Sequence, residues 1–236
     1  MKAFLLAAGE GTRLRPFTFH TPKCLIPIGG IPLLEIWYRQ LERIGIREVL
    51  INTHHLHEKV ARFIQGFKTP VQTRITFEPQ LLGSAGTIAK NRAFVEKEPY
   101  FWIIYVDSVT TLNLQELLQL HLEKKPLLTL ALFHTPVPQD SGIVSLDKEG
   151  RIIQFIEKPK NPPTDLSNTG IMIASPQILD AIPNKIPCDL SYDVLPHLIG
   201  QMYGKVTEAF FIDIGTIERY QEAIRKWNDI KKELGF

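Results

Sequence analysis

Residues 3–16, AFLLAAGEGTRLRP, join a short apolar run to a loop that carries two glycines and two arginines. The run at residues 3–7 predicts a buried strand, because continuous apolar runs bounded by turn residues are typical of strands covered on both faces. In open parallel sheets, ligands bind beyond the carboxyl ends of the strands, and the loop that starts at Gly9 holds that position. Its bare backbone would let a flat base or a phosphate approach closely, and Arg13 and Lys23 add positive charge. A binding loop and a simple glycine turn with surface arginines are both open at this point.

Two familiar phosphate-binding patterns do not fit this loop. A P-loop needs a Gly-Lys pair followed by serine or threonine, and no such pair follows Gly9 and Gly11. The dinucleotide pattern G-x-G-x-x-G would need a glycine where the chain has Leu14. Residues 9–30 contain three prolines and no convincing element, and loops of this length are usually functional or disordered. We expect an ordered binding loop, because prolines fix the backbone and the apolar side chains of the segment can pack.

Strand and helix patterns alternate as far as residue 133. Strands are expected at residues 3–7, 49–52, 74–77, 101–106 and 127–133, and helices at residues 33–44, 56–64, 85–94 and 114–122. Repeated alternation of this kind predicts a mostly parallel sheet with helices on both faces. The fold class is therefore expected to be α/β, with a Rossmann-like sheet flanked by helices.

The pattern changes in the second half, where short strands follow one another. Residues 142–146 and 151–156 predict a hairpin, since the turn signal at residues 147–150 joins two strand patterns. The remaining elements are expected as a strand at residues 169–174, a helix at 192–202, a strand at 210–214 and a helix at 217–234 capped by Thr216. No internal repeat or low-complexity linker divides the chain, so residues 1–236 are expected to form one domain with a small β-rich insertion.

Composition and charge argue against several classes of protein. The 236 residues include 27 Lys and Arg against 25 Asp and Glu, and the net charge of +2 gives no broad attraction to nucleic acid or anionic membrane. No stretch approaches the ~18 to 20 apolar residues of a membrane span, and the N-terminal apolar run is shorter than the ~7–15 residues of a signal-peptide core. The two cysteines, Cys24 and Cys188, suggest neither a disulfide framework nor a metal cluster. We therefore expect a soluble cytoplasmic protein with no nucleic-acid or membrane partner.

Two aspartates follow strand patterns at places where a ligand would lie. Asp107 ends the apolar run at residues 101–106, and Asp213 follows the apolar residues 210–212. Two carboxylates from separate strand ends would suit Mg²⁺, which takes one or two carboxylates together with phosphate oxygens. The alternatives are a helix cap for Asp213 and the start of a turn for Asp107.

Three further groups of polar residues have both a functional and a structural interpretation. Lys158, within the Glu-Lys-Pro triplet at residues 157–159, could hold a phosphate or simply end a strand in water. The Asn-Thr-Gly sequence at residues 168–170 could bond sugar hydroxyls or make a turn. Three histidines lie close together in the sequence, at positions 54, 55 and 57. No cysteine or further histidine nearby would complete a zinc site with them, so structural roles are favoured for His54, His55 and His57. No spacing typical of a Ser-His-Asp or Cys-His arrangement stands out, so covalent catalysis has no support.

Together these motifs resemble the sugar-1-phosphate nucleotidyltransferases, also called nucleotide-sugar pyrophosphorylases. Residues 6–35, LAAGEGTRLRPFTFHTPKCLIPIGGIPLLE, follow the family pattern L-A-[AG]-G-x-G-T-R-L-x-P-x-T-x-x-x-P-K-x-x-x-P. Further matches follow in chain order at residues 82–86, 107–108, 157–159, 168–170 and 213–216. The resemblance therefore covers nearly the whole chain.

The resemblance implies Mg²⁺-dependent transfer of a nucleoside monophosphate from an NTP to a sugar-1-phosphate, with release of pyrophosphate. Arg13 would meet the leaving pyrophosphate and Lys23 the α-phosphate, while Asp107 and Asp213 would hold the metal, which makes these four the expected catalytic residues. The expected nucleotide-binding residues are Leu6, Ala7, Ala8, Gly9, Gly11, Thr12, Arg13, Lys23, Glu78, Gly83 and Ser84. The expected sugar-phosphate-binding residues are Gly142, Glu157, Lys158, Asn168 and Gly170. Residues 1–135 would form the nucleotide-binding part of the domain, and residues 136–236 the sugar-phosphate-binding part with the C-terminal helix.

The choice of substrates rests on a shorter match. Glu78 followed by residues 82–86 resembles the segment E-x-x-P-L-G-T-A-G, through which mannose- and heptose-1-phosphate guanylyltransferases partly read guanine. This favours GTP with mannose- or heptose-1-phosphate, and the alternative is the same chemistry with UTP, dTTP or CTP and a glucose-, N-acetylmuramic acid- or choline-type phosphate. A non-catalytic nucleotide-sugar-binding regulatory subunit is a second alternative, favoured by Val106, which replaces the glycine usual before the metal aspartate. Leu81 in place of proline and Ser141 in place of tyrosine are further departures, and a homo-oligomer is left open.

Overall fold

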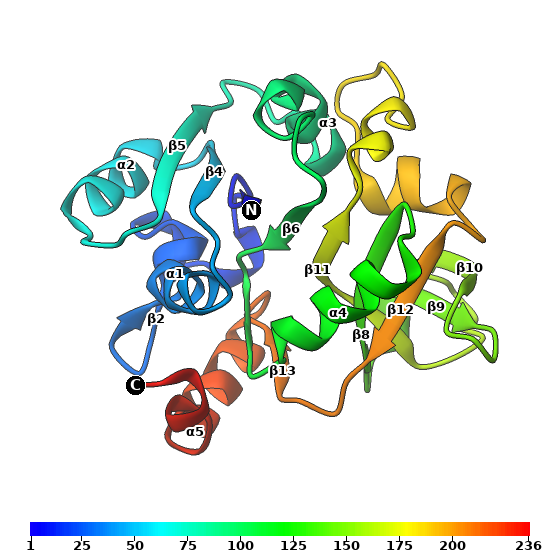
Figure 1. The fold of residues 1–236 in the computed structure, drawn as a ribbon. Helices are drawn as coiled ribbons and strands as arrows, with labels where there is room; N and C mark the ends of the chain where they lie inside the picture. The colour runs from blue at the N-terminus through cyan, green and yellow to red at the C-terminus, as the bar shows by residue number, and fades with distance from the viewer. The chain divides into compact units, whose positions relative to one another are not determined.

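The computed structural model describes residues 1–236, and the chain divides into two compact units (Figure 1). The first unit consists of residues 1–81, 105–112 and 209–236, and the second unit consists of residues 82–104 and 113–208. Both units are assembled from segments that are distant in the sequence, because the chain passes from one unit to the other at four positions. The expectation of one domain with parts that meet near residue 135 stays a prediction.

The first unit contains a parallel sheet whose strands are β1 (Lys2–Leu6), β4 (Glu48–Thr53) and β5 (Gln72–Phe77), in the order β1-β4-β5. In this register Leu5 lies opposite Ile51, which in turn lies opposite Ile75. The carboxyl ends of the three strands therefore meet at one edge of the sheet, which is the edge where the glycine loop begins.

Three helices and two short antiparallel strand pairs complete the first unit: α1 (Leu33–Arg43), α2 (His57–Gly66), α5 (Ile217–Leu234), β2 (Pro27–Ile28) with β3 (Ile31–Pro32), and β7 (Ser108–Thr110) with β13 (Phe211–Asp213). α2 packs against β5, and α5 packs against β13 and β2. The predicted cap of α5 is confirmed, because Thr216 Oγ1 accepts a hydrogen bond from the amide of Arg219 at 3.3 Å. No helix of the chain combines the length and the apolarity that a membrane crossing requires.

Large side chains from β1 and α1 form the centre of the first unit's core. Phe4 and Leu5 of β1 and Trp37 of α1 have no exposed surface. The indole of Trp37 donates a hydrogen bond to the carbonyl oxygen of Ser108 at 3.0 Å, so its polar atom is satisfied inside the core. Burying each of these side chains stabilises the fold by roughly 1.5–3 kcal/mol. This packing holds β1, and with it the start of the glycine loop, in one place.

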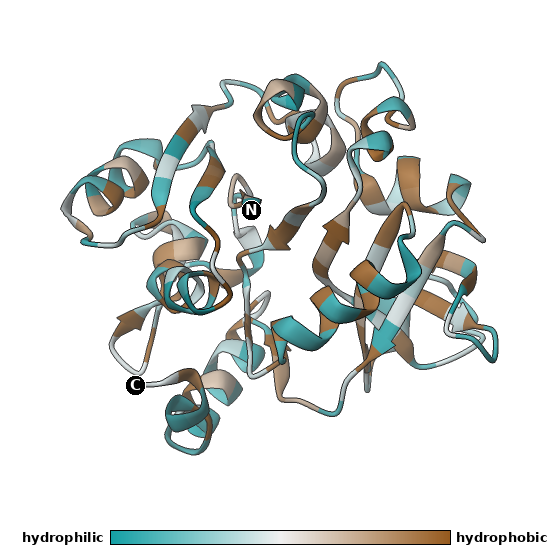
Figure 2. Cartoon of the chain, viewed as in Figure 1, coloured by the Kyte–Doolittle hydropathy of each residue, from teal (hydrophilic) through white to brown (hydrophobic).

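The second unit contains a mixed sheet in which most neighbouring strands are antiparallel. Its central strand, β11, pairs with β6, β8 and β9, while β10 pairs with β9 and β12 runs parallel to β8. The strands are β6 (Phe101–Tyr105), β8 (Leu128–His134), β9 (Gly142–Leu146), β10 (Ile152–Glu157), β11 (Leu166–Ala174) and β12 (Met202–Val206), and the helices are α3 (Ser84–Lys90) and α4 (Leu114–Lys124). α4 packs against β8, β11 and β12, and Figure 2 shows hydrophobic colours along β6. The expected α/β class is confirmed, with the parallel strand–helix part in the first unit and the β-rich part in the second.

The predicted helix at residues 192–202 is absent. The chain instead forms one π-helical turn at Leu190–Val194, a 3₁₀ turn at Leu195–His197, and then β12. Pro196 has no amide hydrogen for a helical ladder, and Gly200 has a φ of +82°, which ends any helix and turns the chain toward β12. The prediction was wrong because these two residues interrupt a regular α-helix within the segment.

The long loop at residues 9–30 is built from short turns that pack against the first unit. It contains 3₁₀ turns at Thr12–Leu14, Phe17–Phe19 and Lys23–Leu25. Leu14 and Ile26 are buried, as expected for apolar side chains of this segment, whereas Phe17 is 45% exposed and does not follow that expectation.

Both cysteines are free and buried. Burial raises the pKa of the Cys24 thiol to about 12, so this thiol stays protonated at neutral pH.

Candidate active site

The loop after β1 leaves its backbone open at Gly9 and folds tightly at Gly11. A Cβ added at Gly9 would meet no atom within 4 Å, whereas one added at Gly11 would lie 2.8 Å from Thr18 Cγ2 and 3.5 Å from Lys23 Cβ. Gly11 also has a φ of +63°, a conformation that favours glycine, and its carbonyl oxygen accepts a hydrogen bond from Thr18 Oγ1 at 2.8 Å. The fold thus places Lys23 directly beside the glycine backbone.

Lys23 and Asp107 are in direct contact although 84 residues separate them. The ammonium of Lys23 donates a hydrogen bond to Asp107 Oδ2 at 2.7 Å, with the two side chains 12% and 38% exposed. Burial alone would raise the pKa of the Asp107 carboxyl, but the charge and hydrogen bond of Lys23 outweigh it and hold that pKa below its ordinary value. Asp107 is therefore ionised at neutral pH.

The two aspartates lie on neighbouring strand ends of the first unit. β13 pairs with β7 so that Asp213 lies opposite Ser108, the residue after Asp107. The amide of Ile214 donates a hydrogen bond to the carbonyl oxygen of Asp107 at 2.8 Å. The backbone therefore places Asp107 and Asp213, the two predicted metal ligands, at neighbouring positions of this strand pair.

Asp213 is surrounded by two arginines and a glycine. Arg219, in the first turn of α5, forms an ion pair with Asp213 Oδ2, and the amide of Gly215 donates to Asp213 Oδ1 at 3.0 Å. A Cβ added at Gly215 would lie 2.5 Å from Asp213 Oδ1 and 3.2 Å from Nη2 of Arg13. The missing side chain at Gly215 therefore lets the Arg13 guanidinium approach Asp213.

Asp107 and Asp213 fit Mg²⁺ by the chemistry of their donor atoms. Carboxylate oxygens are hard ligands, and Mg²⁺ in phosphate chemistry needs only one or two of them, because phosphate oxygens and water supply the rest. Both carboxylates are compensated here by cations, Lys23 and Arg219. No group of three or more His, Cys, Asp or Glu residues in the chain could form a metal cage, so an ion at this place would depend on phosphate oxygens.

Glu78 directly follows β5 and is held through Asn52 at the end of β4. The side chain of Glu78 is 1% exposed, and its Oε1 accepts a hydrogen bond from Asn52 Nδ2 at 2.9 Å. Asn52 Oδ1 in turn accepts from the amide of Ala7 at 2.7 Å. One asparagine therefore connects the start of the glycine loop with the predicted base-reading residue.

The neighbouring histidines bond to groups of the first unit. His54 Nδ1 lies 2.7 Å from the carbonyl oxygen of Glu78, and His55 Nε2 lies 2.7 Å from that of Thr18. His57 Nδ1 lies 2.8 Å from Thr53 Oγ1. These contacts agree with the structural roles predicted for the three histidines, because each ring fixes a loop or a helix start.

In the second unit, Glu157 faces Gly142 across the β10–β9 pair. The two residues are register partners, and a Cβ added at Gly142 would lie 2.7 Å from Glu157 Oε2. Burial raises the pKa of the Glu157 carboxyl above its ordinary value, against the opposing charge of Lys158. Gly142 therefore provides the space that this carboxyl occupies.

The side chain of Asn168 forms a hydrogen bond within the second unit, whereas the side chain of Lys158 is exposed. Lys158 directly follows β10, is exposed, and has a φ of +48°, while its amide donates to the carbonyl oxygen of Ser141 at 3.0 Å. Asn168 Oδ1 accepts from the amide of Gly170 at 3.0 Å, where the register of β11 with β8 shifts. Residues 168–170 therefore form an irregular stretch within β11 and not a turn between elements, and the exposed Lys158 keeps its ammonium in solvent.

Gly83 and Ser84 begin α3 and bind the segment that follows Cys188. Gly83 has a φ of +78°, and a Cβ added there would lie 2.2 Å from the carbonyl oxygen of Cys188. Ser84 Oγ donates to Asp189 Oδ2 at 2.9 Å and accepts from the amide of Leu190 at 2.7 Å. Both predicted nucleotide-binding residues therefore also hold the second unit together.

Replacing Gly83 with alanine is expected to lower the free energy of unfolding by about 2–4 kcal/mol. The new Cβ would clash with the backbone of Cys188, and alanine would also have to adopt the positive φ of Gly83. The matched control is Gly66→Ala at the end of α2, where no atom lies within 4 Å of an added Cβ. Chemical denaturation of both variants measures the difference, and the control should change by less than about 1 kcal/mol. Equal unfolding free energies for the two variants would contradict the close approach at Gly83.

Asn52 and Arg219 are the residues of this region that sequence reasoning missed. Asn52 lies near the end of a predicted parallel strand, and Arg219 lies three residues after the predicted cap Thr216. Both residues lie within predicted elements. Their partners, Glu78 for Asn52 and Asp213 for Arg219, lie in other elements of the chain, so the sequence did not reveal these contacts.

Val106, which replaces the glycine usual in the resembling family, is buried, with 1% of its surface exposed.

Comparisons with known proteins bear on the family of the chain. The chain is 34% identical to a UTP–glucose-1-phosphate uridylyltransferase from Synechocystis sp., in a match that covers 95% of this chain and 63% of that protein. It is 30% identical to a mannose-1-phosphate guanylyltransferase from Mycobacterium tuberculosis, with 92% of this chain and 62% of that protein covered. The chain thus spans less than two thirds of the length of these curated relatives.

The fold is shared with a solved structure and the sequence with a family model. The structure of HddC from Yersinia pseudotuberculosis, in complex with GMP-PN, has a TM-score of 0.80 at 24% identity and covers 96% of this chain and 99% of its own. The family model described as nucleotidyl transferase matches residues 2–230. With a match over almost its whole length, the chain belongs to the nucleotidyl transferase family.

Proposed function

We propose that the chain transfers a nucleoside monophosphate from an NTP to a sugar-1-phosphate, with GTP and mannose- or heptose-1-phosphate as the preferred pair. A phosphate oxygen of the sugar-1-phosphate forms a bond to the α-phosphorus of the NTP. The bond between that phosphorus and the oxygen that bridges to the β-phosphate breaks, and the electron pair leaves with pyrophosphate. The observation that carries this proposal is the contact of Lys23 with Asp107 beside the open glycine backbone.

Lys23 and Arg13 are the cations that would act on the triphosphate. Lys23 lies beside the glycine loop, which supports assigning its ammonium to the α-phosphate, where the new bond forms and negative charge must be neutralised. Arg13 lies close to Asp213 with an exposed side chain, and its guanidinium suits the two phosphates of the leaving pyrophosphate. Such chemistry depends on positioning and charge neutralisation, which agrees with the lack of a nucleophile arrangement in the sequence.

Asp107 and Asp213 would hold Mg²⁺, which when bound supplies positive charge to the phosphate oxygens. The chain prepares Asp107 for this role by keeping it ionised through Lys23. Arg219 forms an ion pair with Asp213, and its backbone amide donates to the cap residue Thr216 at the start of α5.

In the second unit, Lys158 and Glu157 are proposed for the sugar-1-phosphate. Lys158 has an exposed ammonium for the phosphate group, and Glu157 offers carboxyl oxygens for sugar hydroxyls. The glycine at position 142 supports this assignment, because a side chain there would compete with the Glu157 carboxyl for space.

The preference for guanine is supported by Glu78. A carboxylate group offers two acceptor oxygens, and guanine offers two adjacent donors, its N1–H and its amino group. The anchoring of Glu78 by Asn52 would fix this acceptor in one orientation. The mannose-1-phosphate guanylyltransferase among the relatives and the GMP-PN complex of HddC point to the same base. UTP is the second candidate, favoured by the 34% identity to the Synechocystis uridylyltransferase.

The test is a pyrophosphate-release assay that crosses GTP, UTP, dTTP and CTP with glucose-, mannose- and heptose-1-phosphate, with and without Mg²⁺. Release should require all three components, and GTP should exceed the other nucleotides by about 10- to 100-fold in kcat/KM, because a pyrimidine leaves the buried carboxylate imperfectly paired. Release with UTP as the best donor would assign the second candidate. Thermal stabilisation by nucleotides without release from any pair would refute catalysis and indicate a regulatory subunit.

A further inference from the structure

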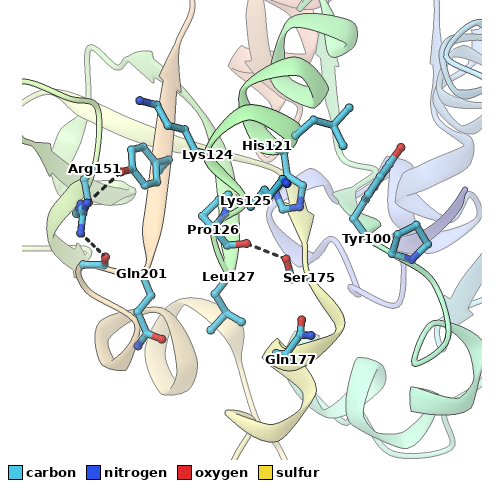
Figure 3. A pocket seen from close by; sticks show the side chains of 14 residues that line it. Tyr100, His121, Lys124, Lys125, Pro126, Leu127, Arg151, Ser175, Gln177 and Gln201 are labelled. Atoms are coloured by element: carbon cyan, nitrogen blue, oxygen red, sulfur yellow. Dashed lines mark hydrogen bonds between the residues drawn. The ribbon is translucent and has the colours of Figure 1, made fainter.

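A depression of about 800 Å³ lies within the second unit, between the end of α4, the start of β8 and the residues before β12 (Figure 3). Sites for small molecules commonly measure about 300–1,000 Å³, so its size is that of a ligand site. None of the residues predicted for the transfer reaction lines it. We call it the α4 pocket and define it by Tyr100, Leu122, Lys124, Lys125, Arg151 and Tyr203.

The α4 pocket is positively charged. Lys124, Lys125 and Arg151 line it, and no aspartate or glutamate does. Arg151 has one carboxylate nearby, with its Nε 3.9 Å from Asp147 Oδ2, whereas neither lysine forms an ion pair. The two lysines therefore have no paired carboxylate, and an anionic ligand would supply a counter-charge.

Tyr203 organises the cationic end of the pocket. Lys124 Nζ lies 5.6 Å and Arg151 Cζ lies 5.5 Å from the centre of the Tyr203 ring. Arg151 Nη2 also donates to the Tyr203 hydroxyl at 3.2 Å, and its Nη1 donates to the carbonyl oxygen of Gly200 at 3.4 Å. An arginine held at two points beside a lysine is an arrangement that suits a phosphate group, because charge-assisted bonds to phosphate oxygens are strong and directional.

The other end of the pocket is aromatic and apolar. Figure 3 shows Tyr100 on the opposite side of the view from Arg151. The Tyr100 ring meets the His121 ring edge-on at 5.8 Å, and the nearby Leu122 is 47% exposed although it is a large aliphatic residue. A flat ring that covered these side chains would remove apolar surface from water.

The floor of the pocket is tied together by hydrogen bonds, so little would need to move on binding. The amide of Leu127 donates to the carbonyl oxygen of Gln201 at 3.0 Å, and the amide of Ser175 donates to that of Leu127 at 3.0 Å. Ser175 Oγ also donates to the carbonyl oxygen of Pro126 at 2.8 Å. A preformed floor keeps the ordering cost of a ligand low.

The pocket combines two cations beside Tyr203 at one end with aromatic and apolar side chains at the other. We propose that it is a second binding site for a phosphorylated compound that carries a flat ring, such as a nucleoside phosphate. The phosphate lies against Lys124 and Arg151, and the ring lies against Tyr100 and Leu122. The site goes beyond the proposed transfer reaction and does not depend on it, because it shares no residue with that reaction.

The test uses the whole chain with Lys23→Ala, a change outside the second unit that blocks turnover at the predicted reaction site, and the positions of the shifted amides tell the two sites apart. Binding of GMP, UMP, ribose 5-phosphate, uridine and inorganic phosphate is measured by calorimetry and by the shifts of backbone amide signals. The two nucleotides should bind and shift the amides of Lys125 and Gln201, while ribose 5-phosphate and uridine, which each lack one half of the ligand, should bind about tenfold or more weakly. GMP carries a purine and UMP a pyrimidine, so the pair shows which size of base the pocket takes. Binding of either nucleotide to the pocket supports the proposal.

The matched variants remove charge inside and outside the pocket. Lys124→Gln with Lys125→Gln should weaken nucleotide binding by about tenfold or more, because Lys124 loses its charged contact with the phosphate and Lys125 no longer adds to the positive charge of the pocket. Lys97→Gln with Lys148→Gln changes two exposed lysines of the same unit that do not line the pocket, and should leave binding unchanged. Melting curves show whether the variants fold, and the amide shifts of the Lys23→Ala chain decide the question without any change to the pocket.

Three outcomes would overturn the proposal. These are no binding of either nucleotide at millimolar concentration, amide shifts confined to residues outside the pocket, and inorganic phosphate that binds as tightly as the nucleotides. None of them bears on pyrophosphate release, so failure of this site and failure of the proposed reaction are distinguishable.

Discussion

Replacing Asp107 with asparagine is expected to lower kcat on the order of 100- to 1,000-fold, a loss typical of removing one charge-stabilising group from a reaction site. Asparagine keeps the shape of the side chain but removes the negative charge that pairs with Lys23 at 2.7 Å and that would bind Mg²⁺. The measurement is pyrophosphate release at saturating substrates over a range of Mg²⁺ concentrations. Partial recovery at high Mg²⁺ would support the ligand role, because a weakened site can still be filled by mass action.

The control for this change is Asp229→Asn, which neutralises an exposed aspartate of α5 in the same unit. It should leave kcat unchanged. The melting temperature of Asp107→Asn should also stay close to that of the unchanged chain, since a pair whose carboxylate is 38% exposed contributes only about 0–1 kcal/mol to stability. Near-normal turnover in Asp107→Asn would refute the role assigned to this residue.

Replacing Lys23 with alanine is expected to lower kcat by a similar factor, on the order of 100- to 1,000-fold, because the α-phosphate loses the cation that stabilises charge as the new bond forms. The effect should fall on kcat more than on KM, since the interaction strengthens in the transition state. The change also leaves Asp107 without its hydrogen-bonded ammonium, so the pKa of that carboxyl should rise toward its ordinary value. Steady-state kinetics with the best substrate pair measures both parameters.

Lys68→Ala is the matched control, because Lys68 is an exposed lysine of the first unit without a role in the site. Lys23→Arg is a useful second variant, since it keeps the charge but replaces a compact ammonium with a planar group. A rise in KM with unchanged kcat in Lys23→Ala would show that Lys23 serves binding only, contrary to the proposal.

The long helices and the parallel strands of the first unit could be predicted from the sequence because their signals are local, whereas the short strands β2, β3 and β7 were not predicted. The strand after Met1, the helix after Pro32 and the cap at Thr216 depend on apolar spacing and on residues within one or two turns. The wrong helix at residues 192–202 shows where a prediction of this kind fails, because Pro196 and Gly200 lie within that segment and interrupt a regular α-helix.

The contacts of the candidate site could be predicted only in part. The sequence singled out Lys23, Asp107 and Asp213 as residue types at strand ends and in a glycine loop. It carried no information on which cation meets which carboxylate, or on the bond from Asn52 to Glu78, because these pairs join segments that are 26 to 84 residues apart. The α4 pocket left no motif at all, since its lining comes from five separate stretches that share only their place in the second unit.

By itself, therefore, the sequence determined the α/β class, most helices and strands, the family and the kinds of side chain available for phosphate chemistry. Those properties follow from local periodicity and from motifs written in consecutive residues. Only the tertiary structure decided that Lys23 neutralises Asp107, that Gly215 admits Arg13 beside Asp213, and that three cations of the second unit surround one pocket. The physical reason is that electrostatic and hydrogen-bond partners act over a few ångströms in space, and folding alone sets which residues come that close.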